Sequence, residues 1–239
     1  MEQLTVGIYV PSYKRSDAIL TYHLFEKCTY MVRKSEAQAY LDAGIAPEDL
    51  WAVDDELINN GVKAYFYIVD NAPDDIIVVA DDDIEDVIFR LAEPYHLNKD
   101  KEKITTEIYR IAQLMYDLDI GFGSNAMLGA PYNYDREFAW KGVPSGIKWF
   151  NRKKFKARPD MKVSFNFDID LVMQELLVNR ICLIPKYFCL SAHMDGGKGG
   201  NSNKKRQMQI NSIENMKLKW GKYFSYSYKS NKPHINVKR

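Results

Sequence analysis

Three consecutive aspartates, Asp81, Asp82 and Asp83, directly follow an apolar run at residues 76–80. Neighbouring carboxylates repel one another, so three of them together favour a bound cation. Their hard oxygen atoms suit Mg²⁺ or Mn²⁺, usually with a phosphate completing the coordination shell. Alternatively, they could cap a following helix at residues 84–91, which accounts for one aspartate better than for three. We therefore predict a metal site that also meets a phosphate-like ligand.

The segments before the aspartates alternate between strand and helix patterns. The run at 76–80 is apolar throughout, as expected for a strand buried on both faces of a parallel sheet. The alternation predicts an α/β fold with a Rossmann-like, open and mainly parallel sheet and helices on both faces. Ligands of such sheets bind at the carboxyl ends of the strands, where the aspartates stand. The predicted strands cover residues 4–10, 29–32, 50–53 and 76–80, and the predicted helices cover residues 17–27, 35–43 and 54–71.

The second half of the chain has a weaker pattern. Apolar residues recur at helical spacing over residues 103–118. Residues 121–144 are rich in Gly, Asn, Pro and aromatics, which is typical of a long functional loop. Further predicted elements are strands at 147–150, 163–167 and 181–184, a helix at 170–179, and a glycine-rich loop at 196–200.

The composition is that of an ordinary folded protein, with 239 residues of which 46% are apolar and 27% charged. No apolar run approaches about 18 residues, and the start lacks the basic-then-apolar pattern of a secretory signal. The three cysteines, Cys28, Cys182 and Cys189, are odd in number and scattered, which argues against a disulfide framework and a zinc site. We expect a cytoplasmic protein without membrane partners, in the host cytoplasm if it is viral.

Charge is unevenly distributed along the chain. Residues 198–239 contain eleven Lys or Arg and one acidic residue, Glu214, which gives a net charge of +10. The whole chain carries +1, so the preceding residues carry about −9 (1 − 10). A basic segment on an acidic body indicates a polyanionic partner, usually DNA or RNA. The alternative is a solvated tail that only aids solubility.

Several short motifs together resemble a known group of enzymes. The first strand ends in Pro-Ser-Tyr-Lys-Arg at residues 11–15, and the aspartates stand in Val-Ala-Asp-Asp-Asp-Ile at 79–84. With a predicted helix ahead of the aspartate strand, this order resembles the inverting glycosyltransferases of the A-type fold. More narrowly, with Tyr-Met-Val-Arg-Lys-Ser-Glu at 30–36 and Phe-Asp-Ile-Asp-Leu at 167–171, the chain resembles the TET-associated glycosyltransferases of phages and their relatives. This implies transfer of a sugar from a nucleotide donor, expected to be UDP-linked, to a hydroxymethyl pyrimidine in DNA.

The resemblance implies a donor site built from several segments. The loop after the first strand would line the base and ribose of the nucleotide, and Arg15 can meet a phosphate. One of the first two aspartates would meet the ribose, while Asp83, with Asp81 as a further candidate, would ligate Mn²⁺ or Mg²⁺. Lys63 stands near the place where many A-type enzymes have an arginine. The candidate donor-binding residues are Pro11, Ser12, Tyr13, Arg15, Lys34, Lys63, Asp81 and Asp82.

The resemblance also implies a catalytic base and a further metal ligand. Asp168 matches best a carboxylate that takes the proton of the acceptor hydroxyl, and Asp170 would position the acceptor or the helix. The alternative is that both aspartates only cap the helix that follows. His193 matches a histidine that completes the metal shell in several A-type enzymes.

The glycines after His193 and the cations that follow them predict a flexible flap. Lys204 and Lys205 would close over the diphosphate and exclude water, which would otherwise hydrolyse the donor. Alternatively, they contact nucleic-acid phosphates. Aromatic and basic residues at 132–136 and 149–152 could stack on a base flipped out of DNA, although aromatics also line sugar pockets and ordinary cores.

We therefore expect an A-type catalytic domain at residues 1–200 and a basic, aromatic-rich segment at 201–239 that packs on it or extends it. The expected enzyme transfers a sugar to hydroxymethylated DNA, as in phage DNA modification. One alternative keeps the fold but changes the acceptor to a polysaccharide, lipid or small molecule, or makes the enzyme a nucleotidyltransferase. Another is a non-catalytic nucleic-acid-binding module. The sequence leaves the oligomeric state open.

Overall fold

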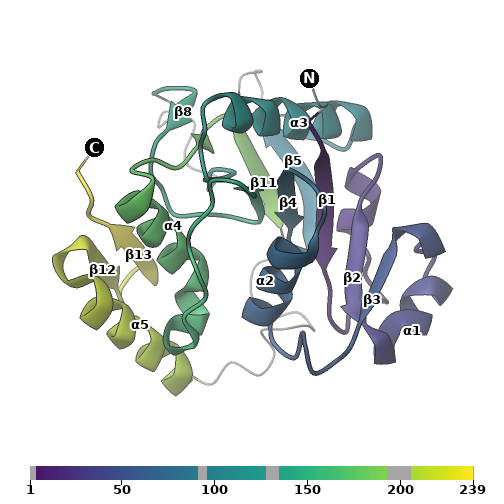
Figure 1. Cartoon of the computed structure of the whole chain (residues 1–239), viewed down its shortest axis with the longest axis horizontal. Helices are drawn as coiled ribbons and strands as arrows, with labels where there is room; N and C mark the ends of the chain where they lie inside the picture. The colour runs from purple at the N-terminus through teal and green to yellow at the C-terminus, as the bar shows by residue number, and fades with distance from the viewer. Residues whose placement is uncertain (1–3, 91–95, 128–134, 193–205, 239) are drawn as a thin grey trace.

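The computed structural model describes residues 4–90, 96–127, 135–192 and 206–238. Its centre is a six-stranded sheet with the strand order β3-β2-β1-β4-β9-β7 (Figure 1). The first four strands in this order are parallel, while β9 runs antiparallel to both β4 and β7. The six strands are β1 (Val6–Pro11), β2 (Thr29–Arg33), β3 (Leu50–Val53), β4 (Ile76–Ala80), β7 (Phe122–Ser124) and β9 (Ile147–Asn151).

Helices cover both faces of this sheet, as the sequence predicts. β4 is buried along its whole length, and its side chains alternate between two apolar clusters. Ile76 and Val78 pack on the side of α1 (Ala37–Asp42) and α3 (Lys101–Asp117). Ile77 and Val79 pack on the side of α2 (Gly61–Asn71) and α4 (Phe167–Val178). The predicted open, mainly parallel α/β sheet is therefore confirmed.

A second sheet follows the aspartates directly and corrects one prediction. The helix predicted at 84–91 is not present over its described residues, 84–90, because β5 (Ile84–Phe89) pairs with β11 (Phe188–Ala192) and β6 (His96–Asn98). The buried side chains of β5 include Ile84 and Val87, which pack in the same cluster as Val78 and Ala80 of the central sheet, and Ile88, which packs in a smaller cluster with Ile184 and Cys189. The aspartates thus connect two strands, so the alternative in which they cap a helix is wrong.

Three further predicted elements differ from the structure. Residues 17–27 form no long helix; they contain a short 3-10 turn, η1 (Thr21–Leu24), whose Thr21 binds the aspartate loop. Residues 163–167 form no strand, because most of them belong to the 3-10 segment η5 (Met161–Asn166) that leads into α4. The helix predicted over 54–71 begins only at Gly61, after Asn60 caps it through Lys63 N at 3.0 Å.

The remaining short elements lie in the middle of the chain. The strand predicted at 181–184 is reduced to β10 (Ile184–Pro185), which pairs with β8 (Phe138–Ala139). The longer strand β11 follows it and was not predicted. Within the described residues, no helix is long and apolar enough to cross a membrane.

The C-terminal residues fold back onto the side of the domain that carries η5 and α4. They form α5 (Arg206–Trp220), the turn η6 (Gly221–Tyr223) and the hairpin of β12 (Phe224–Ser227) and β13 (Lys232–Ile235). Figure 1 shows this C-terminal module beside α4, away from the parallel edge of the sheet. The apolar cluster that joins the two parts contains Val163, Ile169, Met173, Ile213, Met216 and Phe224. The predicted boundary at residue 200 lies outside the described residues.

Candidate active site

The aspartate run lies at the carboxyl end of β4, beside the end of β1. Its backbone is fixed on both sides, because Asp81 N donates to Gly146 O at 2.8 Å. The Thr21 hydroxyl donates to Asp81 O at 2.8 Å and accepts from Ile84 N at 3.0 Å. These contacts hold the three carboxylates at the edge of the sheet where ligands of open α/β folds bind.

The loop after β1 meets the aspartates, as predicted for a donor site. Ser12 Oγ donates to Asp82 Oδ2 at 2.6 Å. The Arg15 guanidinium lies 3.5 Å from Asp82 Oδ1 and 3.3 Å from Asp83 Oδ2. Pro11 ends β1 opposite Met31, whose carbonyl accepts from Ser12 N at 3.0 Å. The structure therefore brings together the ends of β1 and β4 around a cluster of opposite charges.

A buried tyrosine fixes this loop and was not predicted. The Tyr40 hydroxyl lies 2.8 Å from Ser12 Oγ and accepts from Arg15 N at 3.1 Å. Tyr40 is fully buried on α1. The signal in the sequence was its place in the helix after β2, but nothing in the pattern indicated which residue it contacts.

The environment of Asp82 and Asp83 disfavours their negative charge. Burial raises the pKa of Asp82 to about 6, with Asp83 and Asp81 acting in the same direction against Ser12 and Arg15. Burial and the neighbouring Asp81 also raise the pKa of Asp83. A divalent cation at this edge would favour the charged form of these two carboxylates.

A second cluster meets Asp81 from the opposite side. Tyr65 on α2 donates its hydroxyl to Asp81 Oδ1, and burial raises the pKa of that hydroxyl, so it stays protonated. Lys148 Nζ donates to the Tyr65 hydroxyl at 3.2 Å and lies 3.8 Å from Asp81 Oδ1. Lys148 is only 4% exposed in β9. Sequence reasoning missed both residues, although a lysine within the apolar run 147–150 was an available signal.

Asp168 stands in the first turn of α4 and is electrostatically linked to this cluster. Burial raises the pKa of Asp168, Lys148 acts in the opposite direction and Asp81 reinforces the rise. The preceding Phe167 packs edge-on against the Tyr65 ring at 5.2 Å between centroids. Asp168 Oδ1 accepts only a local hydrogen bond from Ile169 N at 2.9 Å among the contacts between described residues. It therefore lies beside the aspartate run with acceptor capacity to spare.

Asp170 has a different environment from Asp168. It is 1% exposed, and its Oδ2 accepts from Gln174 Nε2 at 2.7 Å and Lys219 Nζ at 2.9 Å. Its Oδ1 accepts from Trp220 Nε1 at 2.7 Å. Both carboxylate oxygens of Asp170 are thus engaged by the helices α4 and α5.

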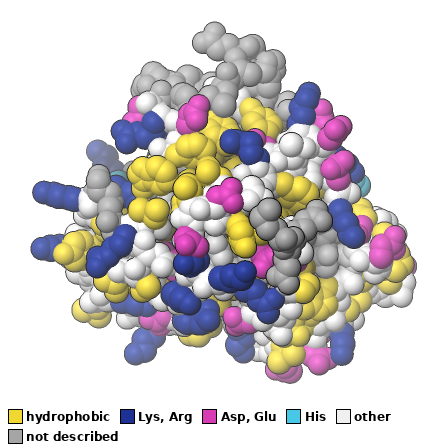
Figure 2. Space-filling model, turned by 45° about the horizontal axis from the view of Figure 1, so that its top comes forward, with side chains coloured by type: hydrophobic (Ala, Val, Ile, Leu, Met, Phe, Trp, Pro, Cys, Tyr) yellow, Lys and Arg dark blue, Asp and Glu magenta, His cyan; other side chains and the backbone are white. Residues whose placement is uncertain are grey.

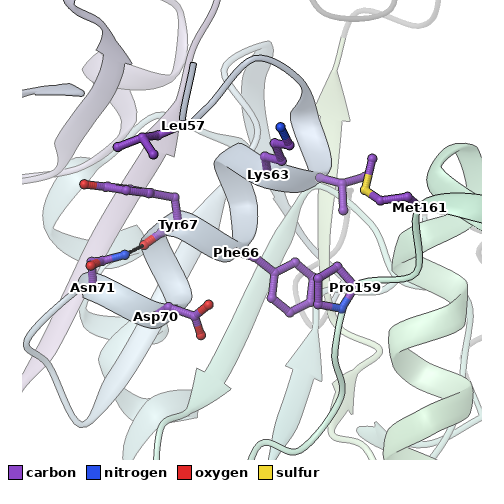
Figure 3. Close-up of a pocket in the computed structure, with 9 residues that line it drawn as sticks. Leu57, Lys63, Phe66, Tyr67, Asp70, Asn71, Pro159 and Met161 are labelled. Atoms are coloured by element: carbon purple, nitrogen blue, oxygen red, sulfur yellow. Dashed lines mark hydrogen bonds between the residues drawn. The ribbon is translucent and has the colours of Figure 1, made fainter. Parts of the chain in front are cut away.

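The other predicted donor residues lie around the site at greater separation. Lys34 makes an exposed ion pair with Asp54 at 2.6 Å. The guanidinium of Arg33 stacks on the Tyr13 ring at 3.9 Å from its centroid. Lys63 projects from α2 beside a surface pocket of about 220 Å³ (Figure 3). Within the described residues, no contact joins Lys63 to the aspartate run.

The donor set at the aspartate run consists of carboxylate oxygens, which suit Mg²⁺ or Mn²⁺. Within the described ranges, no group of three His, Cys, Asp or Glu is arranged to hold a metal ion. A cation here would therefore need ligands from elsewhere, such as the oxygens of a diphosphate. His193, Lys204 and Lys205, predicted for metal and diphosphate, lie outside the described residues.

Comparison with solved structures defines the class of fold. No protein-family model matches the chain, and no curated protein matches it either. Its structural neighbours are glycosyltransferases of the A-type fold, so the chain has this fold.

Two neighbours hold donors and metal. One is a mannosyltransferase from Pyrobaculum calidifontis in complex with GDP-mannose and Mn²⁺, with 13% identity and a TM-score of 0.57 over 82% of this chain. This chain spans 59% of that protein's length. Another is glucosyl-3-phosphoglycerate synthase from Mycobacterium tuberculosis with Mn²⁺, UDP-glucose and phosphoglyceric acid. It has 9% identity and a TM-score of 0.55, over 97% of this chain and 86% of its own.

Proposed function

We propose that this protein is a metal-dependent glycosyltransferase that uses a nucleotide-sugar donor. The observation that carries this proposal is the meeting of Ser12 and Arg15 with Asp82 and Asp83 at the carboxyl edge of the sheet. Hydroxyl, guanidinium and carboxylates at one point can bind the ribose, diphosphate and metal of such a donor. The structural neighbours that hold GDP-mannose or UDP-glucose with Mn²⁺ support the same conclusion.

In the proposed site, each segment has one role toward the donor. Asp83 and Asp81 ligate Mn²⁺ or Mg²⁺. Asp82, whose carboxylate accepts a hydrogen bond from Ser12, binds the ribose. The metal, when bound, neutralises the charge that develops on the diphosphate leaving group. Arg15 moves from the aspartates to the diphosphate, which a guanidinium can bind with two hydrogen bonds. Pro11, Tyr13 and Lys34 line the nucleotide.

Asp168 is the proposed catalytic base. It accepts the proton of the acceptor hydroxyl while that oxygen attacks the anomeric carbon, and inversion follows from a single displacement. The electrostatic influence of Lys148 and Asp81 on its pKa, and the packing of Phe167 on Tyr65, support this role. We assign Asp170 a positioning role instead, because its carboxylate is already bound by Gln174, Lys219 and Trp220.

The proposed acceptor is the hydroxymethyl group of a modified pyrimidine in DNA. The resemblance to the TET-associated glycosyltransferases supports this, as does the basic C-terminal module. The turn η6 and the hairpin, together called the basic hairpin, carry the exposed lysines Lys222, Lys229 and Lys232. Lys222 lies over the ring of the half-exposed Tyr223, and Tyr228 is also half-exposed. Figure 2 shows Lys and Arg side chains projecting at the edge where Figure 1 places this hairpin. Such surfaces bind nucleic-acid backbones.

One part of the DNA-binding prediction is wrong. Trp149 and Phe150 do not stack on a flipped base, because both are buried in the core on opposite faces of β9. The indole N–H of Trp149 donates to Ile108 O at 3.2 Å, inside the layer of α3. The basic hairpin therefore carries the DNA proposal within the described residues.

Incubation with Mn²⁺, a panel of nucleotide sugars and hydroxymethylated DNA tests the proposal, with nucleosides weighed by mass spectrometry. We expect a mass increase of one sugar on the hydroxymethyl pyrimidine and none on plain DNA or with Asp83→Ala. Transfer to a small-molecule or polysaccharide acceptor, with DNA inert, would keep the enzyme class and overturn the acceptor. DNA binding without turnover of any nucleotide sugar would favour the non-catalytic alternative.

A further inference from the structure

The C-terminal helix α5 binds a buried carboxylate, that of Asp170, in the segment that carries Asp168. Asp170, two residues beyond Asp168, receives Lys219 Nζ at 2.9 Å and Trp220 Nε1 at 2.7 Å. Asp170 is 1% exposed, so each of these donors replaces water that the buried carboxylate has lost. A buried carboxylate left without hydrogen-bond donors is strongly unfavourable, so Asp170 requires the donors of α5. We call this contact of Asp170 with Lys219 and Trp220 the junction.

Lys219 also reaches the other end of the same segment. Its Nζ lies 3.0 Å from Asp160 Oδ2, just before η5, while Asp170 lies just after η5. One ammonium group therefore joins both flanks of η5. Between them, Asn215 Nδ2 donates to Lys162 O at 2.9 Å.

The start of α4 depends on α5 for a further reason. Asn166 occupies the N-cap position of α4, but its side chain makes no capping hydrogen bond. Its amide instead donates to Ser212 Oγ of α5 at 2.9 Å, and both residues are buried. A helix start without a side-chain cap is held less firmly by its own sequence. Contacts with α5 take the place of that local restraint.

We propose that α5 is part of the catalytic apparatus, with Lys219 and Trp220 as positioning residues that act through Asp170 to aim Asp168. The inference rests on the proposed function, because it assigns these residues to the base of that reaction. As positioning residues, Lys219 and Trp220 contact neither the donor nor the acceptor. They fix the direction of the first turn of α4, and a general base displaced by about 1 Å loses about 100-fold in rate.

Lys219→Met and Trp220→Phe test the proposal, with Lys217→Met as the matched control. Lys217 stands on the same helix and pairs with the exposed Glu214 at 2.8 Å, so the control removes the same charge outside the junction. We expect the two junction variants to lower kcat by about 10- to 100-fold and to leave the affinity for the nucleoside diphosphate with Mn²⁺ unchanged. Lys219→Arg, which keeps both ion pairs, should restore most of kcat.

Hydrogen exchange of residues 160–170 gives a second readout that needs no turnover. Faster exchange in Lys219→Met than in Lys217→Met, together with the selective loss of kcat, supports the proposal. Wild-type kcat in both junction variants would overturn it, and so would a loss that Lys219→Arg does not recover. Absence of transfer by the wild-type protein would contradict the proposed function itself, while the exchange result would still decide whether α5 restrains the start of α4.

Discussion

Lys148 Nζ lies 3.8 Å from the Asp81 carboxylate, although Lys148 belongs to a central strand and is only 4% exposed. The Tyr65 hydroxyl bridges the two, accepting from Lys148 and donating to Asp81. A buried cation beside the proposed metal ligand and the proposed base can orient both. This arrangement joins three elements, β4, β9 and α2, at the proposed reaction centre.

Replacing Lys148 by Met should therefore impair transfer. We expect kcat to fall by about 10- to 100-fold, because Asp81 and Asp168 lose the cation between them. Steady-state kinetics with a fixed donor measures this, and Lys153→Met, an exposed lysine just after the same strand, is the control. Equal kcat values for Lys148→Met and the wild-type protein would show that Lys148 does not contribute to transfer.

Ser12→Ala should weaken donor binding. The Ser12 hydroxyl bonds the Asp82 carboxylate, and a hydrogen bond to a charged group contributes about 1.5 kcal/mol or more, so we expect about a tenfold rise in the donor Kd. Calorimetric titration with UDP and GDP in the presence of Mn²⁺ measures the change. Ser35→Ala removes a similar hydroxyl–carboxylate contact, with Asp55, outside the site and should leave Kd unaltered.

Asp168→Asn should separate binding from chemistry. The amide keeps the size of the side chain but cannot accept the acceptor proton, so we expect kcat to fall by about 100- to 10,000-fold. Titration of the nucleoside diphosphate with Mn²⁺ should give the wild-type Kd. A variant that still transfers sugar at more than a tenth of the wild-type rate would exclude Asp168 as the base.

Asp82→Asn should change stability in a pH-dependent way. The pKa of Asp82 is raised to about 6 by burial, above its unfolded value, so the folded protein binds this proton more tightly. In the wild-type protein, the contribution of this group is most favourable at pH below about 4 and is lost as the pH rises through about 6. Without metal, the free energy of unfolding of the variant should rise relative to that of the wild-type protein by about 2–3 kcal/mol as the pH increases from 4 to 7. Denaturant unfolding at pH 4 and pH 7 measures this change. If the difference in free energy of unfolding between the variant and the wild-type protein is the same at both pH values, the raised pKa of Asp82 is contradicted.

The basic hairpin should contribute to DNA affinity through phosphate contacts. Replacing Lys222, Lys229 and Lys232 by Gln should reduce the slope of log K against log salt by about 2 to 3. Fluorescence anisotropy with duplex DNA at several salt concentrations measures the slope. A triple Gln variant of the exposed Lys27, Lys101 and Lys103, around α3, is the control. Identical slopes for both variants would place the DNA surface elsewhere.

The central sheet could be predicted because its strands have strong local signals. The continuous apolar run of β4 and the Pro11–Ser12 break after β1 indicate both the strands and the edge at which ligands bind. The helix predicted at 84–91 shows the limit of such signals. Ile84, Val87 and Ile88 have helical spacing, but they are buried because β5 lies between β11 and β6, and that pairing depends on residues far along the chain.

The candidate site was predictable only where one segment held several functional groups. The aspartate run and the loop at 11–15 are such segments, and the structure brings them together. Tyr65, Lys148 and Tyr40 come from three other elements; the two tyrosines look like ordinary core residues in the sequence, and Lys148 differs from its apolar neighbours without indicating its partners. Their roles depend on tertiary contacts, which short-range patterns do not encode.

The Mn²⁺ dependence of nucleotide binding tests the proposed metal-dependent donor site most directly. Equilibrium titration of UDP and GDP, with and without Mn²⁺, compares the wild-type protein with Asp83→Ala. We predict that Mn²⁺ tightens binding of one nucleotide to the wild-type protein by about tenfold or more, and that Asp83→Ala abolishes this gain. Nucleotide affinities that are the same with and without Mn²⁺, or a gain that survives in Asp83→Ala, would contradict a metal-dependent donor site at the three aspartates.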